Sequence, residues 1–173
     1  TAEGTRYVRV RKSVVTYPED LYTTVKWHDG SPLSIADFVM NMILHADRGQ
    51  PGSPIFDETG LSLFDSFKAI RIVSNSPLVI ETYFDAYVLD AENNVVPWWP
   101  EHYTSKDLNR LGSGSWHAVS LGVLAESNGE LAFSGEKAHQ LNIPWMNYLD
   151  GPSLDILANY LHIIRQSSGF IPY

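Results

Sequence analysis

The sequence predicts an α+β domain in which helices pack against an antiparallel sheet. Three observations support this prediction. Short segments in the first half of the chain alternate apolar and polar residues, as half-buried strands do. Two of these segments are separated by only a few turn residues, which favours a hairpin. Longer stretches carry apolar residues three and four positions apart, which is the spacing of amphipathic helices.

Length and composition place the whole chain in one domain. A chain of 173 residues can bury one hydrophobic core, and 44% hydrophobic with 18% charged residues are ordinary globular values. We therefore treat residues 1–173 as a single domain. Because the chain begins at Thr1 without a methionine, we expect it to be a segment excised from a longer protein.

Charge and cysteine content exclude several functions. Twenty acidic against twelve basic residues give a net charge of −8, which argues against a nucleic-acid partner because phosphate backbones repel such a surface. The absence of cysteine excludes disulfides and thiolate metal sites. No run of about 18 apolar residues occurs, so we expect no membrane-spanning segment in this sequence.

Two strands and a turn are expected before the first long helix. Residues 6–12 and 22–27 alternate in the manner of strands. Asp29 and Gly30 follow and predict a turn, because Asp-Gly tolerates positive φ. The basic residues of the first segment are interpreted as solvated strand residues in preference to an anion site: Arg6, Arg9, Arg11 and Lys12.

The clearest helix pattern covers residues 35–46. Ser34 is an N-cap candidate, and Asp37 three residues later gives the pattern of a capping box. Gly49 is placed to end the helix in the left-handed conformation. The predicted apolar stripe consists of Ile35, Phe38, Val39, Met42, Ile43 and Ala46. The predicted polar face opposite carries Asp37, Asn41, His45 and Arg48.

The remaining elements follow after a loop at residues 49–62. Residues 67–73 and 78–84 predict a hairpin, and residues 116–127 predict a helix stopped by Asn128 and Gly129. Small residues on one side of that helix allow close approach of a neighbour: Ala118, Gly122 and Ala125. A last helix, ended by Gly169, has the predicted stripe Leu154, Leu157, Ala158, Leu161 and Ile164.

No complete catalytic or cofactor-binding constellation is visible. Ser134 and Lys137 match the Ser-x-x-Lys nucleophile motif of penicillin-recognising enzymes, but the companion motifs Ser-Asp-Asn and Lys-Thr-Gly are absent. We interpret Ser134 as a helix N-cap and expect no enzyme, no cofactor and no metal. The six histidines show no metal-binding spacing along the sequence. A metal site assembled from histidines that are distant in the sequence stays open as an alternative.

Aromatic residues are the candidates for ligand contact. Trp98, Trp99, Tyr103 and Trp116 concentrate in the irregular middle of the chain, where ligand contacts on a rigid scaffold are often found. The alternative is that these side chains fill a small core beneath long loops. We carry the four residues forward as ligand-binding candidates.

Residues 25–39 read Val-Lys-Trp-His-Asp-Gly-Ser-Pro-Leu-Ser-Ile-Ala-Asp-Phe-Val. This run resembles the signature of extracellular solute-binding proteins of the peptide/nickel family, the receptors of ABC importers. Residues 67–83 resemble the hairpin that follows the signature in that family. Ser31 and Ser34 stand where the family has threonine, and Ile35 stands where alanine is common. Strand end, turn and helix start are the roles expected for Trp27, Asp29, Gly30, Ser34 and Asp37.

The resemblance covers about residues 20–85 and leaves residues 86–173 as an elaboration without a family pattern. It implies one subdomain of a two-lobed, periplasmic-binding-protein-like receptor that closes over a peptide or related solute. It further implies delivery to an ABC permease, an extracytoplasmic location in the periplasm or at the outer face of the cell membrane, and a lipid anchor in a part outside this chain. The signature itself carries no ligand contacts.

Two other functions stay open beside this expectation. One is a serine hydrolase that uses Ser134 and Lys137. The other is a protein-interaction domain whose aromatic middle docks on a partner protein or on the permease. An activated serine would react with a β-lactam or fluorophosphonate probe, whereas an interaction domain would change its solution mass with concentration.

Overall fold

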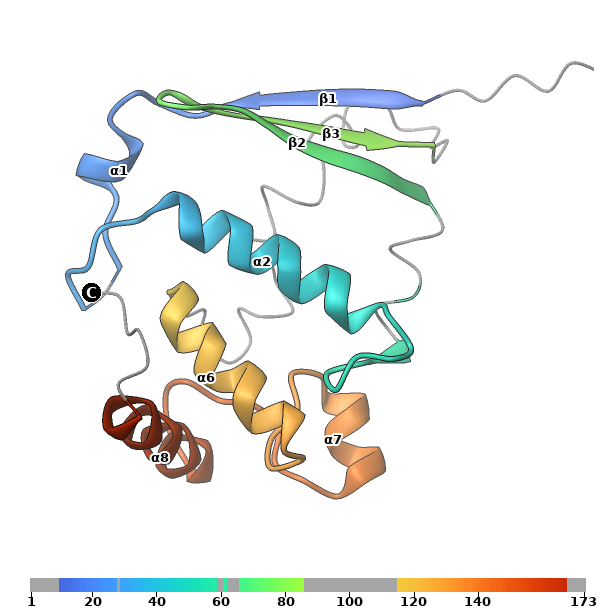
Figure 1. Ribbon diagram of the computed structural model, residues 1–173, viewed down its shortest axis with the longest axis vertical. Coiled ribbons are helices and arrows are strands. Elements are labelled where there is room, and N and C mark those ends of the chain that lie inside the picture. Colours follow the sequence, from blue (N-terminus) through green and yellow to red (C-terminus); the bar gives the residue numbers. More distant parts are fainter. Residues whose placement is uncertain (1–9, 28, 59–60, 62–65, 86–114, 168–173) are drawn as a thin grey trace, which may run out of the picture.

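The computed structural model describes residues 10–27, 29–58, 61, 66–85 and 115–167. In this part of the chain a three-stranded antiparallel sheet and five helices confirm the predicted α+β class (Figure 1). The sheet covers one side of α2, and α6 lies on the other side of α2 together with α7 and α8 (Figure 1). In chain order the elements are β1 (Arg11–Thr16), α1 (Leu21–Thr24), α2 (Ile35–Arg48), β2 (Phe67–Asn75), β3 (Leu78–Phe84), α6 (Trp116–Ser127), α7 (Gly135–Leu141) and α8 (Pro152–Gln166).

The predicted hairpin is confirmed: β2 and β3 follow each other in the sequence and pair as antiparallel strands. The strand order is β1-β3-β2, so β3 is central and pairs on both sides. Its alternate residues Leu78 and Ile80 are buried and pack with Ile70 and Ile72 of β2 against α2. The apolar face that these two strands share therefore builds the core next to α2.

The first strand is shifted relative to its prediction. The alternating pattern placed it at residues 6–12, whereas β1 runs from Arg11 to Thr16 and residues 6–9 lie outside the described part. Pairing with β3 decides the position, because Val15 lies opposite the buried Ile80. Of the basic cluster, Lys12 forms an ion pair with Glu81 on β3. The Arg11 guanidinium lies 5.9 Å from the ring centre of Phe84.

The second predicted strand, at residues 22–27, is wrong. The chain instead forms the short helix α1, followed by an isolated antiparallel bridge between Lys26 and Pro32. Local hydrogen bonds explain the difference: the backbone N–H and the hydroxyl of both Thr23 and Thr24 donate to the carbonyl oxygen of Asp20. Such side-chain bonds to the backbone compete with strand pairing.

Helix α2 is confirmed, but it is buried on two sides and not on one. Phe38 packs toward the sheet with Leu33, while Leu44 packs into the helical layer beyond. Two details of the prediction are wrong as a result: Ile43 of the apolar stripe is 49% exposed, and Asp37 of the polar face is buried. Gly49 ends the helix with φ of −86°, which is not left-handed.

Helix α8 is rotated relative to its predicted stripe. Leu157 is buried as expected, but Leu154 and Ala158 are exposed, and Ser153 and Tyr160 are buried in their place. Polar contacts set this rotation, because the Ser153 hydroxyl donates to the carbonyl of Trp145 and the Tyr160 hydroxyl donates to Glu130. The spacing of apolar residues in the sequence cannot predict these hydrogen bonds.

The helical layer has its own core around the small side of α6. Its buried residues are Leu44, Ile55, Ala125, Leu131, Phe133, Met146, Leu157 and Tyr160. The predicted close approach occurs at Gly122, where a Cβ atom would lie 2.3 Å from the Tyr148 hydroxyl and 2.8 Å from Cζ of Phe133. Only a residue without a side chain fits there.

We predict that Gly122→Ala lowers the free energy of unfolding by about 1–3 kcal/mol, the usual cost of overpacking a core. Urea unfolding followed by circular dichroism measures the change. The matched control is Gly135→Ala at the start of α7, where the nearest atoms to a new Cβ are ring carbons of Trp145 at an ordinary 3.8 Å. Equal stability of the two variants would show that Tyr148 does not pack against Gly122.

Candidate functional site

The signature segment forms a small hairpin that closes at Gly30. The Leu33 N–H donates to the Val25 carbonyl over 3.1 Å, and the Trp27 N–H donates to the Ser31 carbonyl over 2.9 Å. Gly30 has φ of +86°, as expected for this turn. Trp27 is half-buried and packs against the cluster between the sheet and α2.

Asp29 stabilises this turn through its side chain. Its Oδ1 accepts a hydrogen bond of 2.9 Å from the Ser31 N–H and one of 2.6 Å from the Ser31 hydroxyl. The Ser31 hydroxyl therefore takes part directly in the turn. Asp29 and Gly30 are both exposed. Each forms a hydrogen bond within the turn, Asp29 with Ser31 and Gly30 with the Trp27 carbonyl, so both residues stabilise the turn.

Ser34 and Asp37 form the predicted capping box at the start of α2. The Asp37 Oδ2 accepts hydrogen bonds from the Ser34 N–H at 2.7 Å and from the Ser34 hydroxyl at 3.1 Å. Its Oδ1 accepts a third bond of 2.8 Å from the backbone N–H of Trp116, the first residue of α6. One buried carboxylate thus joins the N-terminal ends of two helices that are 79 residues apart.

Of the four aromatic ligand candidates, only Trp116 is among the residues that the structure describes. Trp98, Trp99 and Tyr103 lie outside the described residues. Trp116 is half-buried at the start of α6, with its ring edge-on to His117 at a centroid distance of 6.0 Å. Its backbone is fixed by Asp37, and its side chain does not line the pocket described next.

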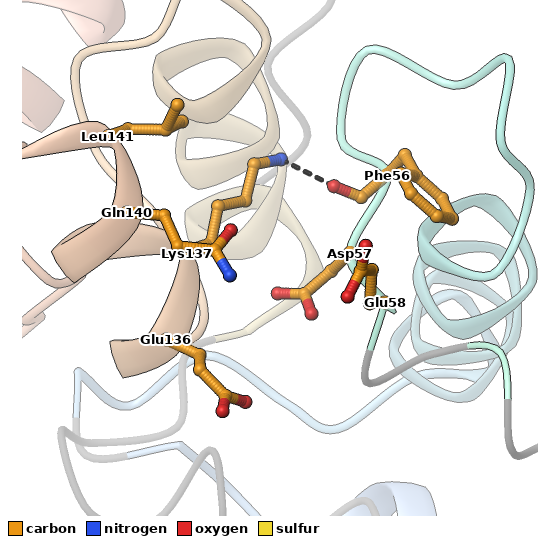
Figure 2. Close-up of a pocket in the computed structure, with 7 residues that line it drawn as sticks. All are labelled: Phe56, Asp57, Glu58, Glu136, Lys137, Gln140 and Leu141. Carbon is orange, nitrogen blue, oxygen red and sulfur yellow. Dashed lines mark hydrogen bonds between the residues drawn. The ribbon is translucent and has the colours of Figure 1, made fainter.

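A pocket of about 400 Å³ lies between the loop that follows α2 and helix α7 (Figure 2). Lys137 reaches across it from α7 and donates a hydrogen bond of 2.8 Å to the carbonyl oxygen of Phe56. Glu58 and Glu136 are exposed on opposite walls. The lining residues are Phe56, Asp57, Glu58, Glu136, Lys137, Gln140 and Leu141.

Two buried ion pairs support the walls of this pocket. The Lys137 ammonium lies 2.8 Å from Oε1 of Glu126, and the Arg48 guanidinium lies 3.0 Å from Oδ2 of Asp57. The Glu126 and Asp57 side chains are 0% and 4% exposed, and those of Lys137 and Arg48 are 15% and 13% exposed. Burial raises the pKa of the Glu126 carboxyl, while Lys137 and Arg48 act to lower it and Asp57 raises it further.

The charges on the walls limit what the pocket can hold. Three lining carboxylates, on Asp57, Glu58 and Glu136, outnumber the one ammonium of Lys137. Asp57 and Lys137 are neutralised by partners, which leaves the two exposed glutamates to set the local potential. Such a surface favours a cationic or neutral polar group and disfavours an anion.

Ser134 and Lys137 are used differently from the nucleophile motif they match. The Ser134 hydroxyl oxygen accepts a 3.1 Å bond from the Lys137 backbone N–H and caps α7, which confirms the N-cap prediction. The Lys137 ammonium is bound to Glu126 and to the Phe56 carbonyl.

Two searches of the described residues gave negative results. No group of three or more histidine, aspartate or glutamate side chains is arranged to hold a metal ion within ranges 10–27, 29–58, 66–85 and 115–167. Among the helices described, none is both long enough and apolar enough to cross a bilayer.

Comparison with known proteins gave no relationship. The chain matches no protein-family model, no curated protein and no solved structure.

The pocket was missed by sequence reasoning. Phe56, Asp57 and Glu58 lie in a stretch that the sequence predicts only as a loop, and Lys137 was considered only as a partner of Ser134. One feature of the sequence could have indicated it: Glu126 is an acid in a helix otherwise rich in apolar and small residues, which suggests that its side chain is buried. An acid in such a place needs a cation, and Lys137 and Arg48 are among the few basic residues of this chain.

We predict that Gly30→Val lowers the free energy of unfolding by about 1–2 kcal/mol, because a β-branched residue adopts positive φ poorly. A new Cβ at Gly30 would meet no atom within 4 Å, so the effect is conformational and not steric. Thermal denaturation measures it. Gly52→Val, at an equally open site without positive φ, is the control. An unchanged melting curve for Gly30→Val would contradict the turn geometry.

We also predict that Asp37→Asn destabilises the protein by about 1–3 kcal/mol, because the amide nitrogen cannot accept the bonds that one carboxylate oxygen accepts now. Asp20→Asn is the matched control, since Asp20 precedes α1 without a side-chain capping bond. Its change should stay within about 0.5 kcal/mol. Urea unfolding of both variants decides the matter, and equal stabilities would refute the bridging role of Asp37.

Proposed function

We propose that this chain is a subdomain of the extracytoplasmic solute-binding receptor of an ABC importer, which captures peptides or related solutes without catalysis. The proposal rests on the likeness of residues 25–39 to the signature of that family. It includes a membrane permease as partner, a location in the periplasm or on the outer face of the cell membrane, and a lipid anchor outside this chain.

The observation that carries the proposal is that five residues of the signature take part in scaffold contacts: Trp27, Asp29, Gly30, Ser34 and Asp37. Trp27 packs into the core, Asp29 and Gly30 close the turn, and Ser34 with Asp37 starts α2. These residues fix a turn and a helix against a sheet, which is the work that the resemblance assigns to the signature. A catalytic signature would instead direct reactive groups toward a common cavity.

The pocket beside α7 is compatible with one wall of a larger binding surface. Its openness and its two exposed glutamates suit contact with a cationic or polar part of a solute. In a two-lobed receptor the ligand is enclosed from both sides, so one subdomain supplies only part of the contacts that offset the cost of association. Trp116, Trp98, Trp99 and Tyr103 remain the proposed aromatic contacts.

We predict that this chain alone binds no small peptide tighter than about 10 μM, which corresponds to roughly 7 kcal/mol. Calorimetric titration with mixtures of di- to pentapeptides is the measurement. The complete receptor, titrated in the same way, should bind at least one peptide more tightly. Trp116→Ala in that receptor should weaken binding.

Three results would overturn the proposal. Tight binding by this chain alone would place a complete site within it. Covalent labelling of Ser134 by a fluorophosphonate or β-lactam probe would favour the hydrolase. A complete protein that stays in the cytoplasm after cell fractionation would exclude the receptor role.

A further inference from the structure

The contact between α7 and the loop after α2 depends on a single ammonium group. Lys137 Nζ donates to the Phe56 carbonyl at 2.8 Å and lies 2.8 Å from the Glu126 carboxylate of α6. One atom therefore joins α7 both to the end of the preceding helix α6 and to Phe56, which is 81 residues away in the sequence. Since Phe56 and Lys137 belong to opposite walls of the pocket, this contact determines how closely the walls approach (Figure 2).

The position of Lys137 is governed by the charge on Glu126. The Glu126 side chain is fully buried, and its Oε2 has no hydrogen-bond partner among the described residues. The Tyr148 hydroxyl, which is also buried, interacts electrostatically with Glu126 and likewise has no partner in the described part of the chain. The carboxylate is thus stabilised chiefly by the Lys137 ammonium, and a neutral Glu126 would attract that ammonium far less.

Charged and titratable groups lie on each of the elements packed around Glu126. Lys137 comes from α7, Arg48 from the end of α2 and Asp57 from the loop, and all three affect Glu126. Tyr148 approaches from the segment before α8. On α8 itself the buried titratable group is Tyr160, which is bonded to Glu130. One turn before Arg48, His45 is half-buried on α2.

We propose that the Glu126–Lys137 pair is a pH-operated latch between α7 and the loop after α2, closed when Glu126 is ionised and released when it is neutral. Release lets the Lys137 ammonium turn toward solvent and gives up its bond to Phe56. The Arg48–Asp57 pair keeps the base of the loop attached to α2 in both states. The latch does not depend on the solute-binding function.

The direction of the pH effect follows from burial. Burial raises the pKa of Glu126, so the folded protein takes up this proton at a higher pH than an unfolded chain would. A raised pKa means that the ionised form is the costly one in the fold. Global stability from this group therefore falls as pH rises through the folded pKa, while the latch closes over the same range.

Hydrogen–deuterium exchange on this chain tests the latch. Amide protection in residues 53–58 and 135–141 should fall about threefold to tenfold when the pH drops from about 8 to about 4, after correction for intrinsic exchange. Glu126→Gln should show the low protection at both pH values. Glu136→Gln, which neutralises an exposed carboxylate of the same pocket, should behave like the unmodified protein. A pH response that persists in Glu126→Gln would overturn the proposal.

A second measurement uses the unmodified protein, so it does not depend on whether the Glu126→Gln variant folds. Carbon-13 NMR follows the Glu126 carboxyl group, and nitrogen-15 NMR follows the Lys137 ammonium, in the unmodified protein. Both signals should change with the same midpoint, above the value of about 4.3 for a solvated glutamate. Different midpoints, or a Lys137 signal that does not change with pH, would refute the latch.

Discussion

The fold depends on one buried carboxylate that starts two helices. Asp37 accepts bonds from the backbone and hydroxyl of Ser34 and from the backbone of Trp116, so it supplies acceptors to the N-terminal ends of α2 and α6 together. Helix N-termini have unpaired N–H groups and a partial positive charge, which compensate an anion without a counter-cation. The helical layer is thereby positioned relative to α2, and α2 relative to the sheet.

Helix α2 can carry this role because it is buried on two sides. Toward the sheet it offers Phe38 to the buried residues of β3, and toward the helical layer it offers Leu44. A helix between two layers cannot keep a solvated polar face along its whole length. Its polar residues must then find partners, as Asp37 does at Trp116 and as Arg48 does at Asp57.

Local patterns in the sequence predicted the parts of the fold that depend on neighbouring residues. The hairpin of β2 and β3, the capping box, the positive φ of Gly30 and the close approach at Gly122 all follow from residues within a few positions of each other. The strand predicted at residues 22–27 failed because threonine hydroxyls bond to the Asp20 carbonyl. Contacts between residues about 80 apart, such as Asp37 with Trp116 and Lys137 with Phe56, leave no periodicity to detect. The pocket was missed for that reason.

Two buried acids, Asp37 at the start of α2 and Glu126 near the end of α6, are stabilised in different ways. This difference separates a fixed junction from a variable one. Asp37 is held by neutral donors whose positions are set by helix geometry, so no other titrating group needs to stay charged for its bonds to persist. Glu126 is held by a flexible lysine that is shared with a loop carbonyl. A long side chain loses more entropy on ordering than a backbone N–H already fixed in a helix. Movement in this domain is therefore expected at the end of α6 near the pocket, while the start of α6 stays joined to α2.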